Sequence, residues 1–357
     1  MKSVWVLGNG QLGQLLRQAG EPMGIRVYPL GFEELPPPLP ESALITSEIE
    51  QWPNTPLTEQ LATHPGLINR AVLPLLADRL TQKQLLETLG LPTAPWALLS
   101  SPEQWPALFA KWGDTIVVKC RRGGYDGHGQ WRVTADQSLQ LPSELYGEAI
   151  VEPWIPFSGE CSLVGARQRQ GRVVFYPLTQ NLHQAGILRA SVARPQPEPR
   201  LQAAAEQLLQ CLMHHLEYLG VMAMECFIVD GALMINELAP RVHNSGHWTQ
   251  AGASISQFAL HLRALCDWPL PTPVVNQSSV MINLIGSPFN VDWLSHPLAQ
   301  LHWYGKTVRP GRKVGHLNFS HADRSRLQQA VGSLEPLLPT EPYPSSLQWA
   351  QEQLVDA

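Results

Sequence analysis

A cluster of four glycines in seven residues, at 123, 124, 127 and 129, is the feature that most constrains how this chain can fold. An apolar run that ends at Lys119 precedes the cluster and the alternating segment 130–133 follows it, so the pattern predicts a strand, a loop and a second strand. Glycines let such a loop fold tightly over an anion and direct several N–H groups at it, and Lys119 adds a full positive charge. We therefore predict a flexible lid over phosphate; the alternative is a glycine-rich hairpin beside a surface lysine.

A second glycine loop, "GNGQLG" at residues 8–13, lies between a strand pattern and a helix pattern. The N–H groups at the start of such a helix are a favourable site for a phosphate. A dinucleotide site would also need an acid at the end of the second strand, whereas Glu33 lies beyond that end. The loop therefore favours a single phosphate-bearing ligand over NAD, and a purely structural turn is the third possibility.

Two glutamates, Glu225 and Glu237, lie in a largely apolar hairpin pattern with a "DG" turn at 230–231. Buried carboxylates need a cation, and Mg²⁺ takes hard oxygen ligands that it shares with substrate phosphates. A simple two-residue turn would pair Glu225 with Asn236 and turn Glu237 to the other face, so joint binding of one metal ion requires a bulge or a longer loop. Pairing of the acids with Arg241 or with amides is the alternative.

A polar loop follows the hairpin and contains Arg241, His243, Asn244 and His247. The two histidines have the spacing of zinc ligands, but the Asn, Ser and Gly between them argue against the continuous helix that this spacing assumes. Hydrogen bonding to a substrate is therefore the favoured role. A basic turn in the tail is either an ordinary solvated turn or a second phosphate clamp, and its members are Lys306, Arg309, Arg312 and Lys313.

Length and composition narrow the class of protein. A chain of 357 residues with 44% apolar residues is long enough for two or three domains. The net charge of −5 and the lack of a basic run disfavour nucleic acid as a partner. Five scattered cysteines with no C-x-x-C pair disfavour disulfides and structural zinc. No apolar stretch approaches the ~18 residues of a membrane span, and the N-terminus begins directly with a strand pattern, so we expect a cytoplasmic protein.

Hydrophobic spacing predicts the main elements. Residues 3–30 follow a strand, helix, strand order, and a helix with Asp78 as its N-cap is expected over 78–90. A long amphipathic helix covers 200–220, and Ser254 with Gln257 predicts a capping box before another helix. The proline-rich segment 267–273 marks the best domain boundary, and the tail from 274 onward is expected to be mostly strands.

The order of these motifs resembles the ATP-grasp superfamily: a strand lysine, a glycine lid, the "VEPWI" segment and two glutamates. Four further segments, "LGNGQLG", "GGYDGHGQ", "NELAPRVHNSGHWT" and "RPGRKVGHLN", look like the N5-carboxyaminoimidazole ribonucleotide synthetase family over nearly the whole chain. The resemblance implies a mixed α/β and α+β fold of three parts. These are a Rossmann-like pre-ATP-grasp domain at 1–78, an ATP-grasp module at 79–270 with a lid subdomain at about 95–155, and a small, mainly β C-terminal domain at 271–357.

The same resemblance implies an ATP-dependent carbon–nitrogen ligase of purine biosynthesis. Bicarbonate would attack the γ-phosphate of ATP, and the amine of aminoimidazole ribonucleotide would capture carboxyphosphate or CO₂ released from it. ATP, bicarbonate and the ribonucleotide would be the only partners besides a second copy in a homodimer, with no nucleic acid and no membrane. The alternatives are another ATP-grasp ligase, such as formate-dependent glycinamide ribonucleotide transformylase, and a nucleotide-binding regulatory protein without turnover.

Site residues also follow from the resemblance, position by position. Catalytic roles are implied for Lys119, Arg241, His243 and Asn244. ATP would be held by Arg79, Lys119, Gly124, Tyr125, Asp126, Gly127, His128, Gly129, Gln130, Glu152, Pro153, Trp154, Ile155, Glu160, His183, Asn236 and Glu237. The metal ligands would be Glu225 and Glu237. The ribonucleotide would contact Gly10, Gln11, Leu12, Tyr125, Asp126, Arg241, His243, Asn244, Lys306, Arg312 and Lys313.

Two positions depart from the family pattern. Many ATP-grasp enzymes carry an asparagine two residues after the second metal glutamate, and this chain has Ala239 there. We therefore expect Asn236 or water to complete the metal shell. At 128 the lid has His where relatives often have a permanently charged residue, which predicts a weaker or pH-sensitive contact with phosphate.

Overall fold

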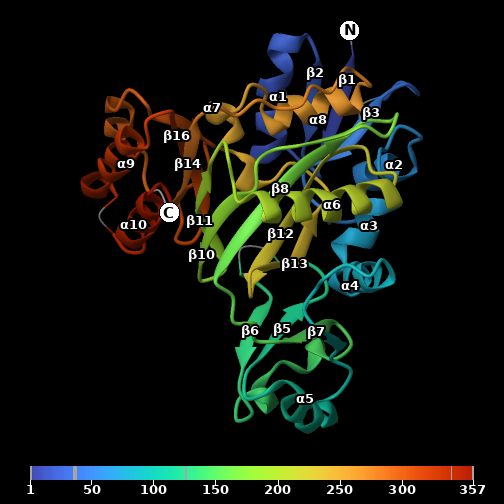
Figure 1. Cartoon of the computed structure of the whole chain (residues 1–357). Helices are drawn as coiled ribbons and strands as arrows, with labels where there is room; N and C mark the ends of the chain where they lie inside the picture. The colour runs from blue at the N-terminus through green and yellow to red at the C-terminus, as the bar shows by residue number, and fades with distance from the viewer. Residues whose placement is uncertain (1, 35–37, 125–126, 339, 356–357) are drawn as a thin grey trace.

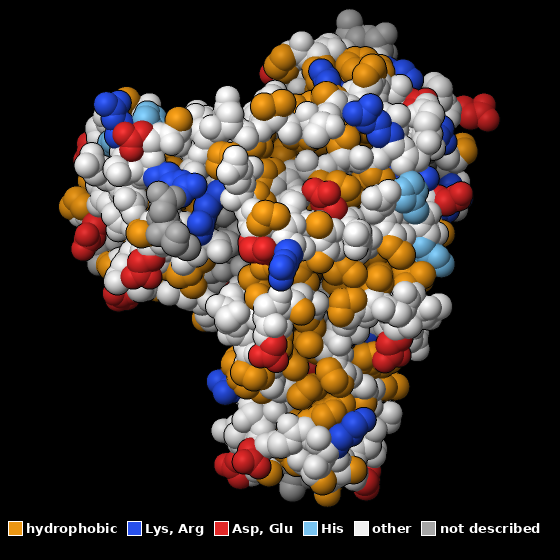
Figure 2. Space-filling view, viewed as in Figure 1, with side chains coloured by type: hydrophobic (Ala, Val, Ile, Leu, Met, Phe, Trp, Pro, Cys, Tyr) orange, Lys and Arg blue, Asp and Glu red, His pale blue; other side chains and the backbone are white. Residues whose placement is uncertain are grey.

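The computed structural model describes residues 2–34, 38–124, 127–338 and 340–355, so the predicted lid residues Tyr125 and Asp126 lie outside the described residues. Within these ranges the strands form three sheets (Figure 1). Figure 2 shows a broad body and a narrower projection, and Figure 1 shows that the projection contains the four-stranded antiparallel sheet. No helix in the described ranges is long and apolar enough to cross a membrane.

The N-terminal unit confirms the predicted strand, helix, strand order. Its parallel sheet has the order β2 (Arg26–Leu30), β1 (Ser3–Leu7) and β3 (Leu44–Ser47). Helix α1 (Gln11–Gly20) lies between β1 and β2 in the chain. It forms a helix with one buried face because its leucines at 12, 15 and 16 recur at helical spacing. Helices α2 (Pro56–Thr63) and α3 (Val72–Ala77) follow.

An antiparallel sheet of nine strands forms the centre of the body. Its strands are, in order, β13 (Ala232–Ala239), β12 (Gly220–Val229), β8 (Gly159–Arg167), β10 (Thr179–Gln184), β11 (Ile187–Ala193), β14 (Ser278–Ile285), β16 (Lys313–His321) and β15 (Gln300–Trp303), with β9 (Val173–Phe175) beside β8.

Alternation along β12 divides the core between the two faces of this sheet. Val221 and Ala223 belong to the cluster that includes helix α8 (Gln257–Leu265), whereas Met222 and Met224 belong to the cluster that includes helix α6 (Pro199–His215). This follows from the two-residue period of a strand, which sends neighbouring side chains to opposite faces. The N-cap of α8 is Ser256, so the predicted capping box at Ser254 is wrong; the Ser254 side chain accepts a hydrogen bond from Val274 instead.

The projection carries the predicted glycine loop. Its four-stranded sheet has the order β4 (Ala97–Leu98), β7 (Ala149–Pro153), β5 (Ile116–Cys120) and β6 (Gln130–Val133), and helix α5 (Trp105–Trp112) packs on it. Helix α4 (Arg79–Thr88) precedes it in the chain and begins, as predicted, at the N-cap Asp78, whose side chain accepts from the Leu80 N–H at 2.9 Å.

The C-terminal strands extend the central sheet, because β14 pairs with β11. Two helices, α9 (Arg324–Gly332) and α10 (Tyr343–Glu352), accompany these strands, so the expectation of a mostly β tail was too simple. Leu327, Ala330 and Val331 recur at helical spacing and bury one face of α9 in the same core as the strands. The three-domain division at 78 and 270 stays a prediction.

Candidate active site

A bulge in the β12–β13 hairpin brings the two predicted metal glutamates face to face. The register pairs Cys226 with Ile235 but shifts at the next position, so that Glu225 pairs with Glu237 and Asn236 is the extra residue. Directly opposite residues of an antiparallel pair point to the same face of the sheet. The structure therefore supplies the bulge that joint metal binding requires.

The environment of Glu225 favours a bound cation. Burial raises the pKa of Glu225, and the neighbouring charges of Glu237 and Glu160 raise it further, while His183 lowers it. A divalent cation would relieve this repulsion between carboxylates. Among the described residues, no group of three or more His, Cys, Asp or Glu side chains is placed to hold a metal ion. Two carboxylates with substrate phosphates nevertheless fit Mg²⁺, which usually keeps several water ligands.

The side chain of Asn236 is already engaged. Its Oδ1 accepts a hydrogen bond from Lys119 Nζ at 2.9 Å. The prediction that Asn236 completes the metal shell is therefore not supported by this arrangement, and water is the remaining candidate. Ala239, two residues beyond Glu237, is buried on the same face and offers no ligand atom.

A buried ion triad fixes the predicted phosphate lysine. Glu152 on β7 bridges Lys119, whose Nζ lies 2.5 Å from Glu152 Oε2, and Lys83 on α4. Burial alone would raise the pKa of Glu152, but the two ammonium groups outweigh it and hold the pKa at about 2. Burial lowers the pKa of Lys83. The Glu152 side chain thus orients Lys119, and the adenine contacts of residues 152–155 stay a prediction.

Arg79 connects the glycine loop with the metal glutamates. Its Nη2 lies 2.9 Å from Glu237 Oε2, and its Nη1 donates to the Cys120 carbonyl at 3.3 Å. The loop packs closely here: a Cβ atom added at Gly124 would lie 2.9 Å from Arg79 Nη1. At the other end of the loop, Gly127 has φ +77° and lies against the turn between β10 and β11, where an added Cβ would meet the Ala185 carbonyl at 2.6 Å. The loop needs glycine at 127, where φ is positive and the neighbour is backbone, whereas Arg79 Nη1 is the end of a flexible side chain that can move away from residue 124.

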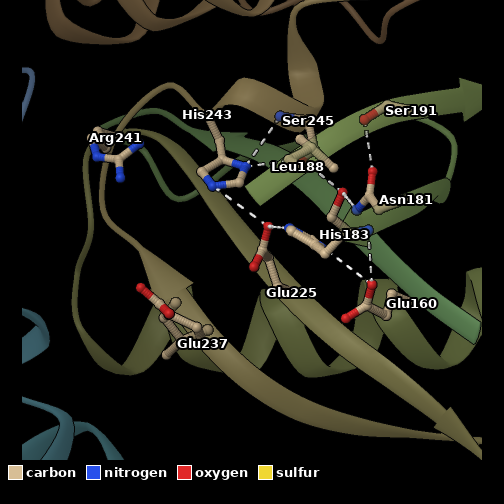
Figure 3. Close-up of polar contacts among 12 residues, drawn as sticks. Glu160, Asn181, His183, Leu188, Ser191, Glu225, Glu237, Arg241, His243 and Ser245 are labelled. Atoms are coloured by element: carbon tan, nitrogen blue, oxygen red, sulfur yellow. Dashed lines mark hydrogen bonds and ion pairs between the residues drawn. The ribbon is translucent and has the colours of Figure 1, made fainter. Parts of the chain in front are cut away.

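Three of the predicted nucleotide and substrate residues, Glu160, His183 and His243, cluster beside Glu225 (Figure 3). His183 Nδ1 lies 2.9 Å from Glu160 Oε2, and its Nε2 lies 3.9 Å from Glu225 Oε1. His243 approaches the same Glu225 oxygen with its Nε2 at 3.6 Å. Burial opposes the charged form of His183, but the hydrogen bond to Glu160 and the charges of both acids outweigh it and raise its pKa.

The polar loop after β13 faces this cluster. Arg241 Nε lies 2.7 Å from Glu50 Oε1 and so connects the N-terminal unit to the loop. Within the described part of the chain, both polar atoms of the buried Asn244 side chain lack a hydrogen-bond partner, which fits a residue that binds a ligand. His247 instead hydrogen-bonds Gln257 and packs against the ring of His316, so the structure does not support a zinc pair with His243. Burial, reinforced by Arg241 and Lys313, lowers the pKa of His243 well below its ordinary value.

The N-terminal glycine loop differs from the phosphate site that its motif predicts. The N–H groups of Gly10 and Gly13 donate to the carboxylate of Glu48, at 2.5 and 2.7 Å. A carboxylate of the protein therefore occupies the position expected for a phosphate. Leu12, predicted to contact substrate, has its side chain in the hydrophobic core. Glu48 directly follows β3. An acid at the end of a parallel strand was the sequence feature that could have predicted this contact.

Replacing Glu48 by Gln is expected to lower the free energy of unfolding by about 1–3 kcal/mol. The amide would keep one acceptor oxygen but would turn its NH₂ group toward the other glycine N–H. Urea denaturation measures the change. Glu33→Gln, at an exposed position beyond β2, is the control and should leave the midpoint unchanged. An unchanged midpoint for Glu48→Gln would restore the hypothesis of a phosphate at this loop.

The basic turn reaches the N-terminal loop through one lysine. Lys306 Nζ donates to Gln11 Oε1 at 2.5 Å, which brings two predicted substrate residues together. Lys313 lies near enough to the polar loop after β13 to add to the burial that lowers the pKa of His243. Arg312 is exposed and donates within the turn, to the Thr307 carbonyl at 3.3 Å. His128 and Gln130 of the lid are also exposed.

Sequence reasoning missed the supports beneath the site. Lys83 follows Arg79 by one helical turn, and this i, i+4 spacing on one face could have identified it. Asp78 is more than a cap: Arg121 binds both of its oxygens, at 3.1 and 2.6 Å, and ties the end of β5 to the start of α4. No local pattern indicated this pairing, because it joins residues that are 43 positions apart.

Comparison with known proteins agrees with this geometry. Residues 84–258 match the ATP-grasp domain, and residues 279–330 match the phosphoribosylaminoimidazole carboxylase C-terminal domain. The chain is 62% identical over 354 residues to the N5-carboxyaminoimidazole ribonucleotide synthase of Escherichia coli (strain K12), with 99% of each chain covered.

Solved structures agree with the fold. The N5-carboxyaminoimidazole ribonucleotide synthetase from Thermus thermophilus superposes with a TM-score of 0.83 at 36% identity, covering 95% of this chain and 99% of that chain. The N5-carboxyaminoimidazole synthase from Aspergillus clavatus, solved with ADP and 5-aminoimidazole ribonucleotide, gives 0.80 at 25% identity, covering 95% and 98%. These matches confirm the family inferred from the motifs: the chain belongs to the N5-carboxyaminoimidazole ribonucleotide synthase family and carries an ATP-grasp domain.

Proposed function

We propose that this chain carboxylates 5-aminoimidazole ribonucleotide in an ATP-dependent reaction of purine biosynthesis, giving N5-carboxyaminoimidazole ribonucleotide, ADP and phosphate. The observation that carries the proposal is the facing pair Glu225 and Glu237, with Arg79 beside it and Lys119 held nearby by Asn236. Family membership and the relative solved with ADP and 5-aminoimidazole ribonucleotide support the choice of substrates.

The first step is phosphoryl transfer. A bicarbonate oxygen attacks the γ-phosphorus of ATP, the bond to the bridging oxygen breaks, and ADP leaves. This chemistry needs positioning and neutralisation of charge, and no protein nucleophile. Arg79 and Lys119 are assigned to the phosphates, with the glycine loop as their cover. Glu225 and Glu237 would hold Mg²⁺, which when bound neutralises phosphate charge.

The second step forms the carbon–nitrogen bond. The amine of the ribonucleotide attacks the carboxyl carbon of carboxyphosphate, or CO₂ released from it, and phosphate departs while the nitrogen loses a proton. Arg241, His243 and Asn244 are assigned to the reacting carboxyl group and the ribonucleotide, together with Gln11, Lys306 and Lys313. Because carboxyphosphate hydrolyses readily, exclusion of water by the glycine loop is part of this assignment. Orientation of the reactants can supply ~7–11 kcal/mol of the barrier.

Assembly and location complete the proposal. We assign the chain to the cytoplasm as a homodimer, as is common in the family. Sedimentation at several protein concentrations tests the dimer, and a single monomer mass at every concentration would contradict it.

Release of ADP is expected to reach its full rate only with bicarbonate and aminoimidazole ribonucleotide present together. Each substrate omitted in turn should reduce the rate, because both are consumed in the complete reaction. A coupled assay for ADP measures this, with formate and glycinamide ribonucleotide as the comparison pair. An equal rate with that pair would favour the transformylase alternative. ATP binding without turnover under any condition would favour a regulatory protein.

A further inference from the structure

Behind His243, a chain of buried polar side chains crosses three strands of the central sheet (Figure 3). Ser191 Oγ lies 2.8 Å from Asn181 Oδ1, Asn181 Nδ2 lies 2.9 Å from Ser162 Oγ, and Ser162 Oγ lies 2.7 Å from Ser245 Oγ. Ser245 Oγ then lies 2.9 Å from His243 Nδ1. The four supporting side chains are at most 4% exposed.

The position of the chain in the sheet is unusual for hydroxyl and amide groups. Ser162 shares its face of β8 with Val164 and Ala166, which belong to the hydrophobic core under α8. Burying hydroxyls and an amide there costs free energy unless they are hydrogen-bonded, and each member of this chain is bonded to the next. Apolar side chains would fill the same positions without that requirement. Burial of these polar groups therefore calls for a functional explanation. The chain ends at His243, which lies in the candidate active site, so we look for that explanation at His243.

Two directions of hydrogen bonding are open to such a chain in principle. Hydroxyl groups rotate and an asparagine amide can be turned over, so every proton could run toward His243 or away from it. One contact decides between them. The backbone N–H of Ser245 also points at His243 Nδ1, at 3.3 Å, and a backbone N–H can only donate. In the intact chain His243 Nδ1 is therefore an acceptor, and the hydroxyl protons run from Ser191 toward His243.

We propose that the Ser191–Asn181–Ser162–Ser245 chain holds His243 in the neutral tautomer with its proton on Nε2. In this form Nε2–H is a hydrogen-bond donor aimed at the carboxylate cluster, where Nε2 lies 3.6 Å from Glu225 Oε1. With substrates bound, it donates to an oxygen of the carboxyl group that is being transferred. This last assignment rests on the proposed function, whereas the tautomer follows from the contacts alone. Ser162, Asn181 and Ser245 are positioning residues, because they act through His243.

The test is to break the chain in its middle. In Ser162→Ala, Ser245 Oγ loses its donor and becomes able to accept a proton from His243 Nδ1. The Ser245 N–H, at 3.3 Å, is the longer and weaker of the two contacts at that nitrogen and does not hold the tautomer alone, so both tautomers become populated. Long-range ¹H–¹⁵N spectra of ¹⁵N-histidine-labelled protein distinguish the protonated from the bare ring nitrogen, and His243→Gln identifies the signals. We expect Nε2–H alone in the wild type and a mixture in Ser162→Ala. We also expect kcat of the variant to fall about tenfold with an unchanged KM for ATP.

A matched control lies in the same sheet. Ser279 on β14 is also fully buried and makes one serine–serine hydrogen bond, to Ser320 at 2.6 Å. Ser279→Ala should cost comparable stability while leaving the His243 spectrum and kcat at wild-type values. A proton on Nδ1 in the wild type, or an unchanged spectrum in Ser162→Ala, overturns the proposal. Failure of the proposed function would be distinguishable from this result. The protein would then release no ADP even though His243 carries its proton on Nε2.

Discussion

Glu237→Gln is expected to lower kcat on the order of 10³-fold while leaving the fold intact. Glutamine keeps the size of the side chain and an oxygen for Arg79, which lies 2.9 Å away, but it removes the charge that faces Glu225 across the bulge. A bound metal stabilises developing charge by several kcal/mol, and each 1.36 kcal/mol corresponds to a factor of ten in rate. ADP release measures the activity, and circular dichroism with thermal unfolding checks the fold.

Two further variants separate the metal role from other causes. Glu225→Gln should cause a loss of similar size, although Glu225 faces His183 and His243 and not Arg79. Glu206→Gln, a half-buried glutamate on α6 that accepts from Gln202, should keep wild-type turnover. Turnover near the wild-type rate in Glu237→Gln would remove the metal role from this residue.

The second large effect is on stability. Glu152→Gln is expected to lower the free energy of unfolding by about 3–5 kcal/mol, because it leaves Lys83 and Lys119 buried without their counter-ion. Urea denaturation with an unchanged m-value measures the loss. Adding Lys83→Met to this variant removes one of the two unpaired charges and should restore part of the stability. A double variant as unstable as the sum of the two single variants would contradict the triad as a coupled unit.

The same triad predicts a dependence on pH with a definite sign. The pKa of Glu152 is held at about 2, below its ordinary value of 4.5. The unfolded chain therefore binds the proton first on acidification, so the contribution of Glu152 is complete above pH 4.5 and is lost as the pH falls toward about 2. Wild-type protein should lose stability over this interval more steeply than Glu152→Gln does. Parallel curves for the two proteins would show that Glu152 is not the group that titrates.

Much of the architecture was predictable because it depends on neighbours in the chain. Spacing of apolar residues is enough to place the first strand, helix, strand unit, and Asp78 marks the start of α4 by capping its own helix. The Asp230–Gly231 pair is typical of a tight turn with positive φ at both residues, so the sequence also predicted the hairpin between β12 and β13. The structure has positive φ at both positions. The order of the motifs along the chain was also sufficient to indicate the family.

The working geometry of the site depended on partners far apart in the chain. A strand pattern cannot show a bulge, yet the bulge beside Glu225 determines whether two carboxylates share a face or point apart. A glycine loop at a helix start indicates that it binds an anion but not which anion, and here Glu48 arrives from 38 residues away. Whether a charged or polar group meets substrate or another side chain is settled by three-dimensional packing, since the cost of burying it must be met by whichever partner the fold brings within hydrogen-bonding distance.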